Sequence, residues 1–358
     1  MHIAIVTACI TSGGAERVIS ELVNKWCEYN GVKCTLVLLY KQPFFYDINK
    51  KVEIVEIGEK SSFYYIDKFL KYSKIREVLK KINADVVLSM PEEIGIYVIG
   101  ALLGTKIPVV VSERNNPEIM PYNKISRILR VLLYPYANGL IFQSRGAMNF
   151  FPNRIRKKGI ILPNPLNLEK LPEPYNKERK KVIVSVGRLE KQKNFQLLIN
   201  AYDLFWRNNQ EYSLTIYGEG CLRKDLEALI KTKNSGKTIF LPGRDENVLE
   251  KIKNASMFVL SSDFEGVPNA LIEAMAMGIP SISTDCEPGG AAMLIENNKN
   301  GLLVPVRDKN ALAEAMQKMH NLNKSNENHL STNGMDVRYR LDAKKVALEW
   351  FNYIKKSV

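Results

Sequence analysis

Short apolar runs alternate along the chain with longer segments whose apolar positions recur at the spacing of a helix. Over the first 160 residues the apolar runs read IAIVTA, CTLVLLY, VEIVEI, DVVLSM, PVVVS and GLIFQS. The segments 15–28, 63–82 and 124–134 carry the helical spacing. Strands that alternate with helices in this way predict βαβ units and a mostly parallel sheet.

The alternation stops at residues 163–181, which hold four prolines and many charges and are typical of a connection between domains. A second series follows, with apolar runs KVIVSVG, YSLTIYG, TIFLPG, MFVLSS, PSIST and GLLVP and helical segments at 195–206, 222–230, 248–252 and from residue 268. We therefore predict an α/β protein of two doubly wound halves, residues 1–170 and 171–340. A basic amphipathic helix is expected within 341–358.

The composition supports this division and narrows the classes of function. A chain of 358 residues is long enough for two domains, and 46% hydrophobic with 25% charged residues is typical of a soluble protein. The five cysteines show no C-x-x-C spacing and are expected to be free, as in a reducing compartment. No apolar run approaches the roughly 18 residues of a membrane-spanning helix, and a cytoplasmic location is expected. The chain has three histidines, at positions 2, 320 and 329, which excludes a His-centred triad or zinc site in the middle of the chain.

Positive charge is concentrated in the first half of the chain. The net charge is +13, and residues 1–170 hold 24 Lys and Arg against 15 Asp and Glu, while residues 119–168 hold no acid at all. Nucleic acid, a membrane surface and a lipid pyrophosphate all fit such a charge. Segment 63–82 adds Lys68, Lys71 and Lys74 at helical spacing. It is either an ordinary packing helix with a wet lysine face or a docking surface for an anionic bilayer.

The most informative stretch is 262–278, SDFEGVPNALIEAMAMG, which follows the apolar run at 257–260. Pro268 suits a first helical turn, so the helix should begin near it. Glu265 then precedes the helix and Glu273 lies about one and a half turns into it. A helix start suits a phosphate, and a carboxylate suits sugar hydroxyls. The alternative is that both glutamates are exposed to solvent.

Two further loops join a strand to a helix and carry glycine. In the first, Gly13 and Gly14 let the backbone approach a ligand closely, although a plain tight turn is an equal alternative. In the second, Gly187 precedes Arg188 and Lys193, whose cations can neutralise a diphosphate; otherwise the loop is a solvated basic turn. The chain has no G-x-G-x-x-G motif, which disfavours a dehydrogenase.

The stretch from Ser262 to Pro280 resembles the E-x7-E signature of the retaining GT-B glycosyltransferases of family 4, the glycosyl transferases group 1. The GGAER segment at 13–17 and the G-R-x-x-x-x-K segment at 187–193 are similar to further segments of that family. The resemblance covers nearly the whole chain and is strongest over 182–305. It implies the GT-B fold, in which two Rossmann-like domains face each other across a cleft and the last helix returns to the first domain.

The resemblance also implies residue roles. The catalytic residues would be Glu265, Arg188 and Lys193. Donor binding would involve Gly14, Gly187, Arg244, Gly266, Val267, Pro268, Asn269 and Glu273. The departing phosphate oxygen would take the acceptor's proton, and fixed cations would stabilise its charge. No metal is expected, because the chain has no D-x-D motif.

The chain departs from the family after the run PVVVS, where many relatives carry a histidine near the transferred sugar. This chain reads Ser112-Glu-Arg-Asn-Asn116 there. A guanidinium cannot act as a base near neutral pH, so Arg114 would hold a phosphate or sugar oxygen, or Glu113 would take the polar role. The sequence leaves both open as acceptor-side candidates.

We therefore expect a retaining glycosyltransferase that moves a sugar from a nucleotide-sugar, expected to be a UDP-sugar, to a saccharide or lipid-linked saccharide. The basic first half favours peripheral binding to an anionic membrane at its inner face, and no nucleic acid partner is expected. The alternatives are a nucleotide-sugar epimerase of the same architecture and a non-catalytic GT-B-like binding protein. The latter would be expected to lack Glu265, Arg188 or Lys193, and all three are present.

Overall fold

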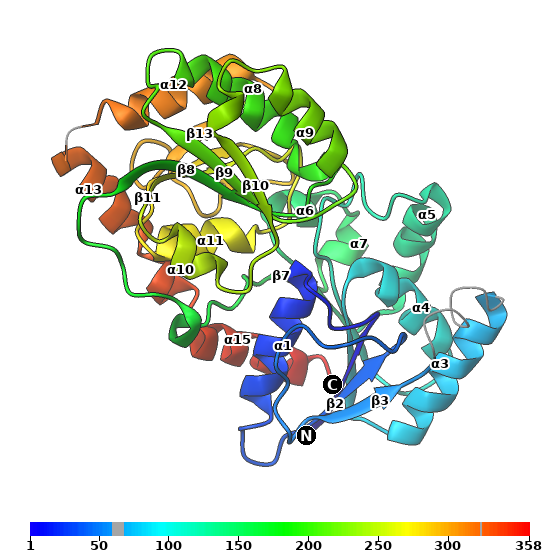
Figure 1. Cartoon of the computed structure of the whole chain (residues 1–358). Helices are drawn as coiled ribbons and strands as arrows, with labels where there is room; N and C mark the ends of the chain where they lie inside the picture. Colours follow the sequence, from blue (N-terminus) through cyan, green and yellow to red (C-terminus); the bar gives the residue numbers. More distant parts are fainter. Residues whose placement is uncertain (59–67, 323) are drawn as a thin grey trace. The chain divides into compact units, whose positions relative to one another are not determined.

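The computed structural model describes residues 1–58, 68–322 and 324–358 (Figure 1). The chain forms two compact units. The first unit comprises Met1–Pro165 with Leu341–Val358, and the second comprises Leu166–Arg340.

The first unit contains a seven-stranded sheet in the order β3-β2-β1-β4-β5-β6-β7. All of its described strand pairs are parallel, which confirms the prediction from alternation. Its strands are β1 (His2–Thr7), β2 (Lys33–Leu38), β3 (Glu53–Glu56), β4 (Val86–Ser89), β5 (Val109–Ser112), β6 (Gly139–Phe142) and β7 (Gly159–Ile161).

Helices cover both faces of this sheet and enclose two apolar cores (Figure 1). They are α1 (Gly14–Trp26), α3 (Lys68–Ile82), α4 (Glu92–Leu102), α5 (Lys124–Leu133), the 3₁₀ turn η1 (Tyr134–Tyr136), α6 (Arg145–Asn149), α7 (Asn153–Arg156) and α15 (Ala343–Lys356). Helix α15 packs against α1, and the indole of Trp26 donates a hydrogen bond of 2.8 Å to the carbonyl of Ala347. The indole of Trp350 likewise donates to Pro163, 3.0 Å away, so both buried tryptophans tie the C-terminal helix into the first unit.

The second unit contains a six-stranded sheet in the order β10-β9-β8-β11-β12-β13, also parallel throughout its described pairs. The strands are β8 (Lys180–Val186), β9 (Ser213–Tyr217), β10 (Ile239–Gly243), β11 (Ala255–Leu260), β12 (Ser281–Thr284) and β13 (Leu302–Val304). Its helices are η2 (Leu168–Lys170), η3 (Lys191–Lys193), α8 (Phe195–Trp206), α9 (Arg223–Lys231), η4 (Gly236–Thr238), α10 (Val248–Ile252), α11 (Asn269–Ala276), α12 (Lys309–His320), α13 (Lys324–Gly334) and α14 (Val337–Arg340). Figure 1 shows α8, α9 and α12 on one face of this sheet and α10 and α11 on the other.

The predicted strands all form, but the prediction missed several elements of the first unit, namely β7, α4, η1, α6 and α7. Helix α4 has the sequence EEIGIYVIGAL and is apolar on most of its sides. It is contacted by α3, α5 and β5, which cover these apolar sides. A helix that is buried on most sides carries no periodic polar face, so the pattern did not reveal it. Residues 63–67 of the predicted helix 63–82 lie outside the described residues, and the remainder, residues 68–82, forms α3.

Candidate functional site

The strand order of the second sheet reverses between β8 and β11, which places the loops after these two strands side by side. Ligands of doubly wound folds bind at such a switch point, beyond the carboxyl ends of the strands. The backbone N–H of Asp263 donates to the carbonyl of Gln192 at 2.9 Å, and the Ser261 hydroxyl donates to the carbonyl of Lys193 at 2.9 Å. The two loops are therefore joined by one backbone–backbone and one side-chain–backbone hydrogen bond.

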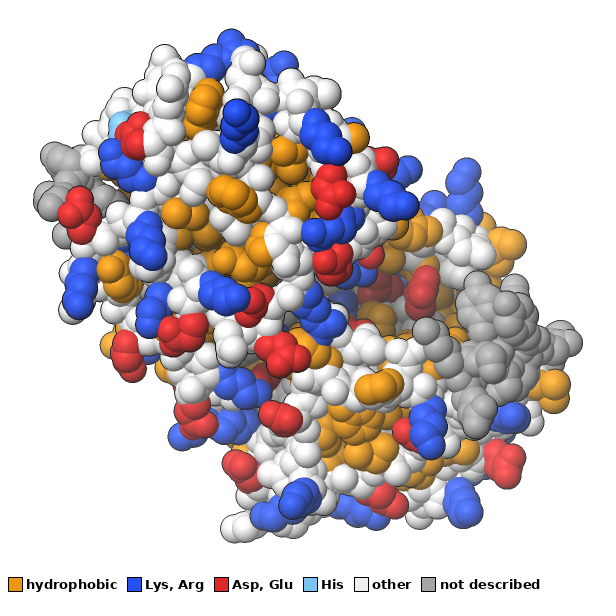
Figure 2. Space-filling model, in the orientation of Figure 1, with side chains coloured by type: hydrophobic (Ala, Val, Ile, Leu, Met, Phe, Trp, Pro, Cys, Tyr) orange, Lys and Arg blue, Asp and Glu red, His pale blue; other side chains and the backbone are white. Residues whose placement is uncertain are grey.

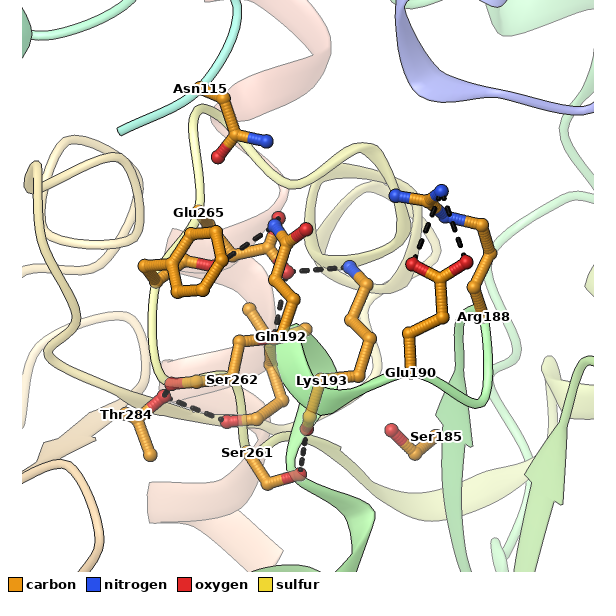
Figure 3. Close-up of polar contacts among 12 residues, drawn as sticks. Asn115, Ser185, Arg188, Glu190, Gln192, Lys193, Ser261, Ser262, Glu265 and Thr284 are labelled. Atoms are coloured by element: carbon orange, nitrogen blue, oxygen red, sulfur yellow. Dashed lines mark hydrogen bonds and ion pairs between the residues drawn. The ribbon is translucent and has the colours of Figure 1, made fainter. Parts of the chain in front are cut away.

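Glu265 lies at the centre of this junction and is 6% exposed (Figure 3). Its Oε1 is 2.5 Å from the Lys193 ammonium and accepts a hydrogen bond of 2.7 Å from the Ser262 hydroxyl. Its Oε2 accepts from the Gln192 amide at 3.2 Å. Three donors on two oxygens fix the orientation of this carboxylate.

Local sequence explains how Lys193 reaches Glu265. Asn194 adopts a left-handed conformation with φ of 44°, which asparagine tolerates better than most residues. Its side chain accepts from the N–H of Leu197 and caps α8, while its amide donates to Asp263 at 2.8 Å. A Cβ atom at Gly187 would lie 3.1 Å from Cε of Lys193, so glycine lets the lysine side chain lie close to the backbone.

Helix α11 begins at Asn269, directly after Pro268, as the prediction placed it. Glu273, in the middle of this helix, is 6% exposed. The alternative that Glu265 and Glu273 are solvent-exposed acids is therefore wrong for both. The predicted donor-binding positions Gly266 and Val267 are buried in the turn between Glu265 and the helix start.

A third loop, residues 284–290, packs against the backbone of Glu265 and Gly266. The carbonyl of Glu287 accepts a hydrogen bond of 3.0 Å from the N–H of Glu265. A Cβ atom at Gly290 would lie 1.6 Å from the carbonyl oxygen of Gly266, so only glycine permits this approach. Burial, together with the nearby Glu265, raises the pKa of the Cys286 thiol to about 12, so this thiol remains protonated.

The other predicted cations of the second unit lie outside the hydrogen-bonded cluster around Glu265. Arg188 has a side chain 59% exposed and its Nη1 is 3.2 Å from Oε2 of Glu190. Figure 3 shows the Arg188 and Lys193 side chains extending from the same loop in the same direction. Arg244 is exposed directly after β10. The sequence thus predicted the loops that carry Lys193 and Glu265, but not that these two side chains contact each other.

In the first unit, Glu113 is enclosed in the protein interior, 1% exposed. Its Oε1 is 2.6 Å from Nη1 of Arg130, and its other oxygen accepts a hydrogen bond from the Tyr134 hydroxyl. Burial raises the pKa of Glu113 to about 8, against the opposing effect of Arg130. The contacts that the structure gives to this carboxylate are internal ones.

Arg114 lies beside Glu113 at the carboxyl edge of the same sheet, but its guanidinium is differently placed. Its Nη2 donates to Oδ1 of Asn164 at 2.6 Å, and its backbone N–H donates to Glu92 at 3.1 Å. Within the described part of the chain, its buried Nε and Nη1 have no hydrogen-bond partner. Burial lowers the pKa of Arg114 to about 10, while Glu92 and Glu16 oppose the shift, so the group stays charged at neutral pH.

The predicted loop residue Gly14, after β1, begins α1.

Three further observations bear on the predictions. No cluster of three or more His, Cys, Asp or Glu side chains that could hold a metal occurs among the described residues, and the expected independence from metal remains a prediction. A cavity of about 1110 Å³ in the second unit is lined by residues such as Met293, Lys299 and Tyr339, apart from the predicted site residues. Over the described ranges, no helix combines the length and apolarity needed to cross a membrane.

Residues 168–335 match the sequence model of the family described as glycosyl transferases group 1. Two proteins of Campylobacter jejuni are similar over most of their length. An N-acetylgalactosamine-N,N'-diacetylbacillosaminyl-diphospho-undecaprenol 4-alpha-N-acetylgalactosaminyltransferase is 31% identical, over 86% of this chain and 87% of the relative. A GalNAc-alpha-(1->4)-GalNAc-alpha-(1->3)-diNAcBac-PP-undecaprenol alpha-1,4-N-acetyl-D-galactosaminyltransferase is 29% identical, over 88% of both chains.

Among solved structures, Anabaena HepE in complex with UDP superimposes with a TM-score of 0.81 at 15% identity, over 99% of this chain and 100% of that one. This likeness establishes the GT-B fold of two Rossmann-like domains. The fold and the relatives together define an enzyme that transfers glycosyl groups. The chain belongs to the glycosyl transferases group 1 family. The epimerase and the non-catalytic binding protein are thereby set aside.

Sequence reasoning missed the roles of Gln192 and Ser262, the two neutral donors to Glu265. Ser262 lies three residues before Glu265, a spacing that lets a loop hydroxyl reach the carboxylate, and this signal was available in the sequence. Gln192 lies 73 residues away from Glu265, and no local pattern relates the two.

Proposed function

We propose that this glycosyltransferase moves a sugar from a UDP-sugar to a saccharide carried on a lipid diphosphate, with retention of configuration at the anomeric carbon. A lysine and a glutamate held together at the switch point of the second sheet, next to the start of α11, carry the proposal. The named relatives act on saccharides linked through a diphosphate to undecaprenol, and HepE was solved with UDP. UDP-hexoses carry an alpha linkage and both relatives are named as alpha transferases, which supports retention.

In this proposal Glu265 accepts hydrogen bonds from hydroxyls of the donor sugar, and Lys193 meets the diphosphate. Arg188, exposed on the same loop, turns from Glu190 to the diphosphate, and Glu273 holds the ribose. Gly187 and the Gly266–Asn269 turn let the donor approach the backbone, while Gly14 and Arg244 contact its phosphate and base. Each position keeps the role that the resemblance implies.

The reaction balances without a protein nucleophile. The bond between the anomeric carbon and the β-phosphate oxygen breaks, and a bond from an acceptor hydroxyl forms on the same face of the sugar. The hydroxyl proton passes to the departing phosphate oxygen, and the products are UDP and the extended saccharide. Lys193, Arg188 and the N-terminus of α11 stabilise the charge that develops on that oxygen, so no metal is required.

On the acceptor side, we assign the polar contact to Arg114 rather than Glu113. The buried, charged guanidinium of Arg114 has two nitrogens without a protein partner, whereas Glu113 is occupied by Arg130 and Tyr134. A phosphate or sugar oxygen of the acceptor would complete the hydrogen bonding of Arg114.

A donor and acceptor screen tests the proposal. The purified protein is incubated with UDP-N-acetylgalactosamine, UDP-N-acetylglucosamine, UDP-galactose or UDP-glucose, with and without polyprenyl-diphosphate saccharides, and UDP release is measured. Lipid-dependent UDP release from one donor is expected, and the product should have the alpha configuration by NMR. A beta-linked product would refute retention, and equal transfer to free saccharides would refute the lipid-linked acceptor.

A further inference from the structure

Three neighbouring strands of the first sheet, β5, β6 and β7, end close to the guanidinium of Arg114. Arg114 lies two residues after β5, Gln143 follows β6 directly, and Asn164 lies three residues after β7. The side-chain oxygen of Asn164 accepts a hydrogen bond of 2.6 Å from Nη2 of Arg114. It accepts a second one, also of 2.6 Å, from Nε2 of Gln143. One amide oxygen therefore joins the segments that follow all three strands.

The orientation of the Arg114 guanidinium depends on very few protein groups. Among the residues that the structure describes, the bond to Asn164 is its only hydrogen bond, because Nε and Nη1 are buried without a partner. Figure 2 shows many Lys and Arg side chains exposed on one face of the molecule, where their charged ends reach water. The buried nitrogens of Arg114 have no such hydration, so the groups that contact this side chain decide where it points.

The C-terminal helix supplies the second contact. Cζ of Arg114 lies 5.9 Å from the ring centroid of Trp350 on α15, within the range at which an aromatic face attracts a cation. Trp350 is fully buried, and its indole N–H donates to the carbonyl of Pro163, the residue before Asn164. The same indole thus contacts the guanidinium and holds the main chain that carries its hydrogen-bond acceptor.

Burial fixes the amide of Asn164 in this orientation. Asn164 is 1% exposed and Gln143 is 2% exposed. Turning the Asn164 amide over would set its NH₂ group against two N–H donors, so the oxygen must face them. A buried donor that loses its acceptor is unfavourable, and here two donors would lose theirs at once. The acceptor oxygen for Arg114 is therefore held in place before any ligand binds.

We propose that Asn164 is a positioning residue: its amide oxygen, supported by Gln143 and Trp350, holds the Arg114 guanidinium with its remaining N–H groups directed at the acceptor. The inference rests on the acceptor role proposed above for Arg114. It adds that the segment after β7 and the C-terminal helix take part in acceptor binding. A guanidinium without these contacts would lose side-chain freedom on binding, which weakens the interaction.

Steady-state kinetics separate positioning from a purely structural role. With the donor and polyprenyl-diphosphate saccharide found in the screen, Asn164→Ala should raise the acceptor KM about tenfold, because an oriented hydrogen bond from a charged group contributes about that factor. The donor KM should not change. The control Asn209→Ala removes a similarly buried amide, 3% exposed, that donates to Phe205 and Gln317 in the second unit. The control should lower stability and keep the acceptor KM.

A double variant tests whether Asn164 acts through Arg114. In Arg114→Ala, the added replacement Asn164→Ala should raise the acceptor KM no further, because the group that it positions is already missing. A further rise as large as that caused by Asn164→Ala in the wild type would overturn the proposal.

Arginine side-chain NMR measures the positioning without substrate. In protein that contains isotope-labelled arginine, the Nε–H signal of Arg114 is identified by its loss in Arg114→Lys. Its heteronuclear NOE should be as high as that of the rigid backbone in the wild type and in Asn164→Asp, which keeps an oxygen facing both donors. The NOE should fall in Asn164→Ala, and an equally high value in this variant would overturn the proposal.

The two measurements distinguish this inference from the proposed function. An acceptor KM that rises in Arg114→Ala but not in Asn164→Ala would keep the acceptor role of Arg114 and overturn the positioning role of Asn164. An acceptor KM unchanged in Arg114→Ala would refute the acceptor role, while a lower NOE in Asn164→Ala would still support the positioning.

Discussion

The replacement Glu265→Gln tests the centre of the site, because it keeps the shape of the side chain and removes its charge. Opposite unit charges 2.5 Å apart attract by about 7 kcal/mol at an effective dielectric constant of about 20. Desolvation offsets much of this, and removing one member of a buried pair typically costs about 3–5 kcal/mol. The Lys193 side chain is 15% exposed and can turn partly to water, so we expect a loss of about 2–3 kcal/mol in the free energy of unfolding.

The loss of activity should be larger than this loss of stability. At a saturating donor concentration, removing one well-placed polar group lowers kcat about 100-fold to 1000-fold. Turnover is measured by UDP release, and stability by urea denaturation of the same preparation. The control is Glu211→Gln, whose partner Lys181 lies 2.9 Å away on the surface, with side chains 43% and 57% exposed. This control should lose under about 1 kcal/mol and keep its activity. Near wild-type turnover in Glu265→Gln would refute the assigned role.

Further predictions concern metal, stability, pH and the acceptor. Activity should persist in EDTA, and complete inhibition that a single divalent ion reverses would contradict a metal-free reaction. Arg130→Ala should lower the free energy of unfolding by at least about 3 kcal/mol, because the bonds of the guanidinium to two carbonyls and its stacking on Phe151 are lost; urea denaturation measures this. The pKa of Glu113 is raised to about 8 in the folded protein, which therefore holds a proton that the unfolded chain releases near pH 4.5. As the pH rises from about 5 to about 8, the free energy of unfolding should therefore fall. Glu113→Gln should lack this part of the pH dependence. Arg114→Ala should raise the KM for the acceptor while donor hydrolysis is retained; a change confined to the donor KM would contradict the assignment.

The sequence was sufficient for every described strand of the two sheets except β7, but not for the contacts between distant loops. The strand runs and helix starts are local signals, and so the beginning of α11 after Pro268 could be predicted within one residue. The contact between Lys193 and Glu265 spans 72 residues and depends on β8 and β11 lying side by side, which strand order alone decides. The fold family suggested both residues without suggesting that they touch.

Helix α5 shows a different limit of sequence reasoning. Its sequence KISRILRVLL predicts an amphipathic helix, but the usual reading places the apolar face inward and the arginines in water. In the structure Val131 and Leu133 do pack inward, but Arg130 is buried as well, because Glu113 and two carbonyls in the interior accept its hydrogen bonds. The remaining isoleucines and leucines of the helix are exposed. Only the tertiary position of these acceptors decides which face is buried.

The close approach of Gly290 to Gly266 has a practical consequence for changing which sugar the enzyme accepts. Redesign of donor preference usually concentrates on residues that face the sugar, which in the proposed function are those of the turn from Glu265 to Asn269. The main chain of that turn is in contact with a loop more than twenty positions further along, and a side chain at 290 would collide with it. Mutagenesis libraries should therefore keep Gly290 unchanged. A library chosen only from residues around the ligand would overlook this position, because it contacts the turn and not the ligand.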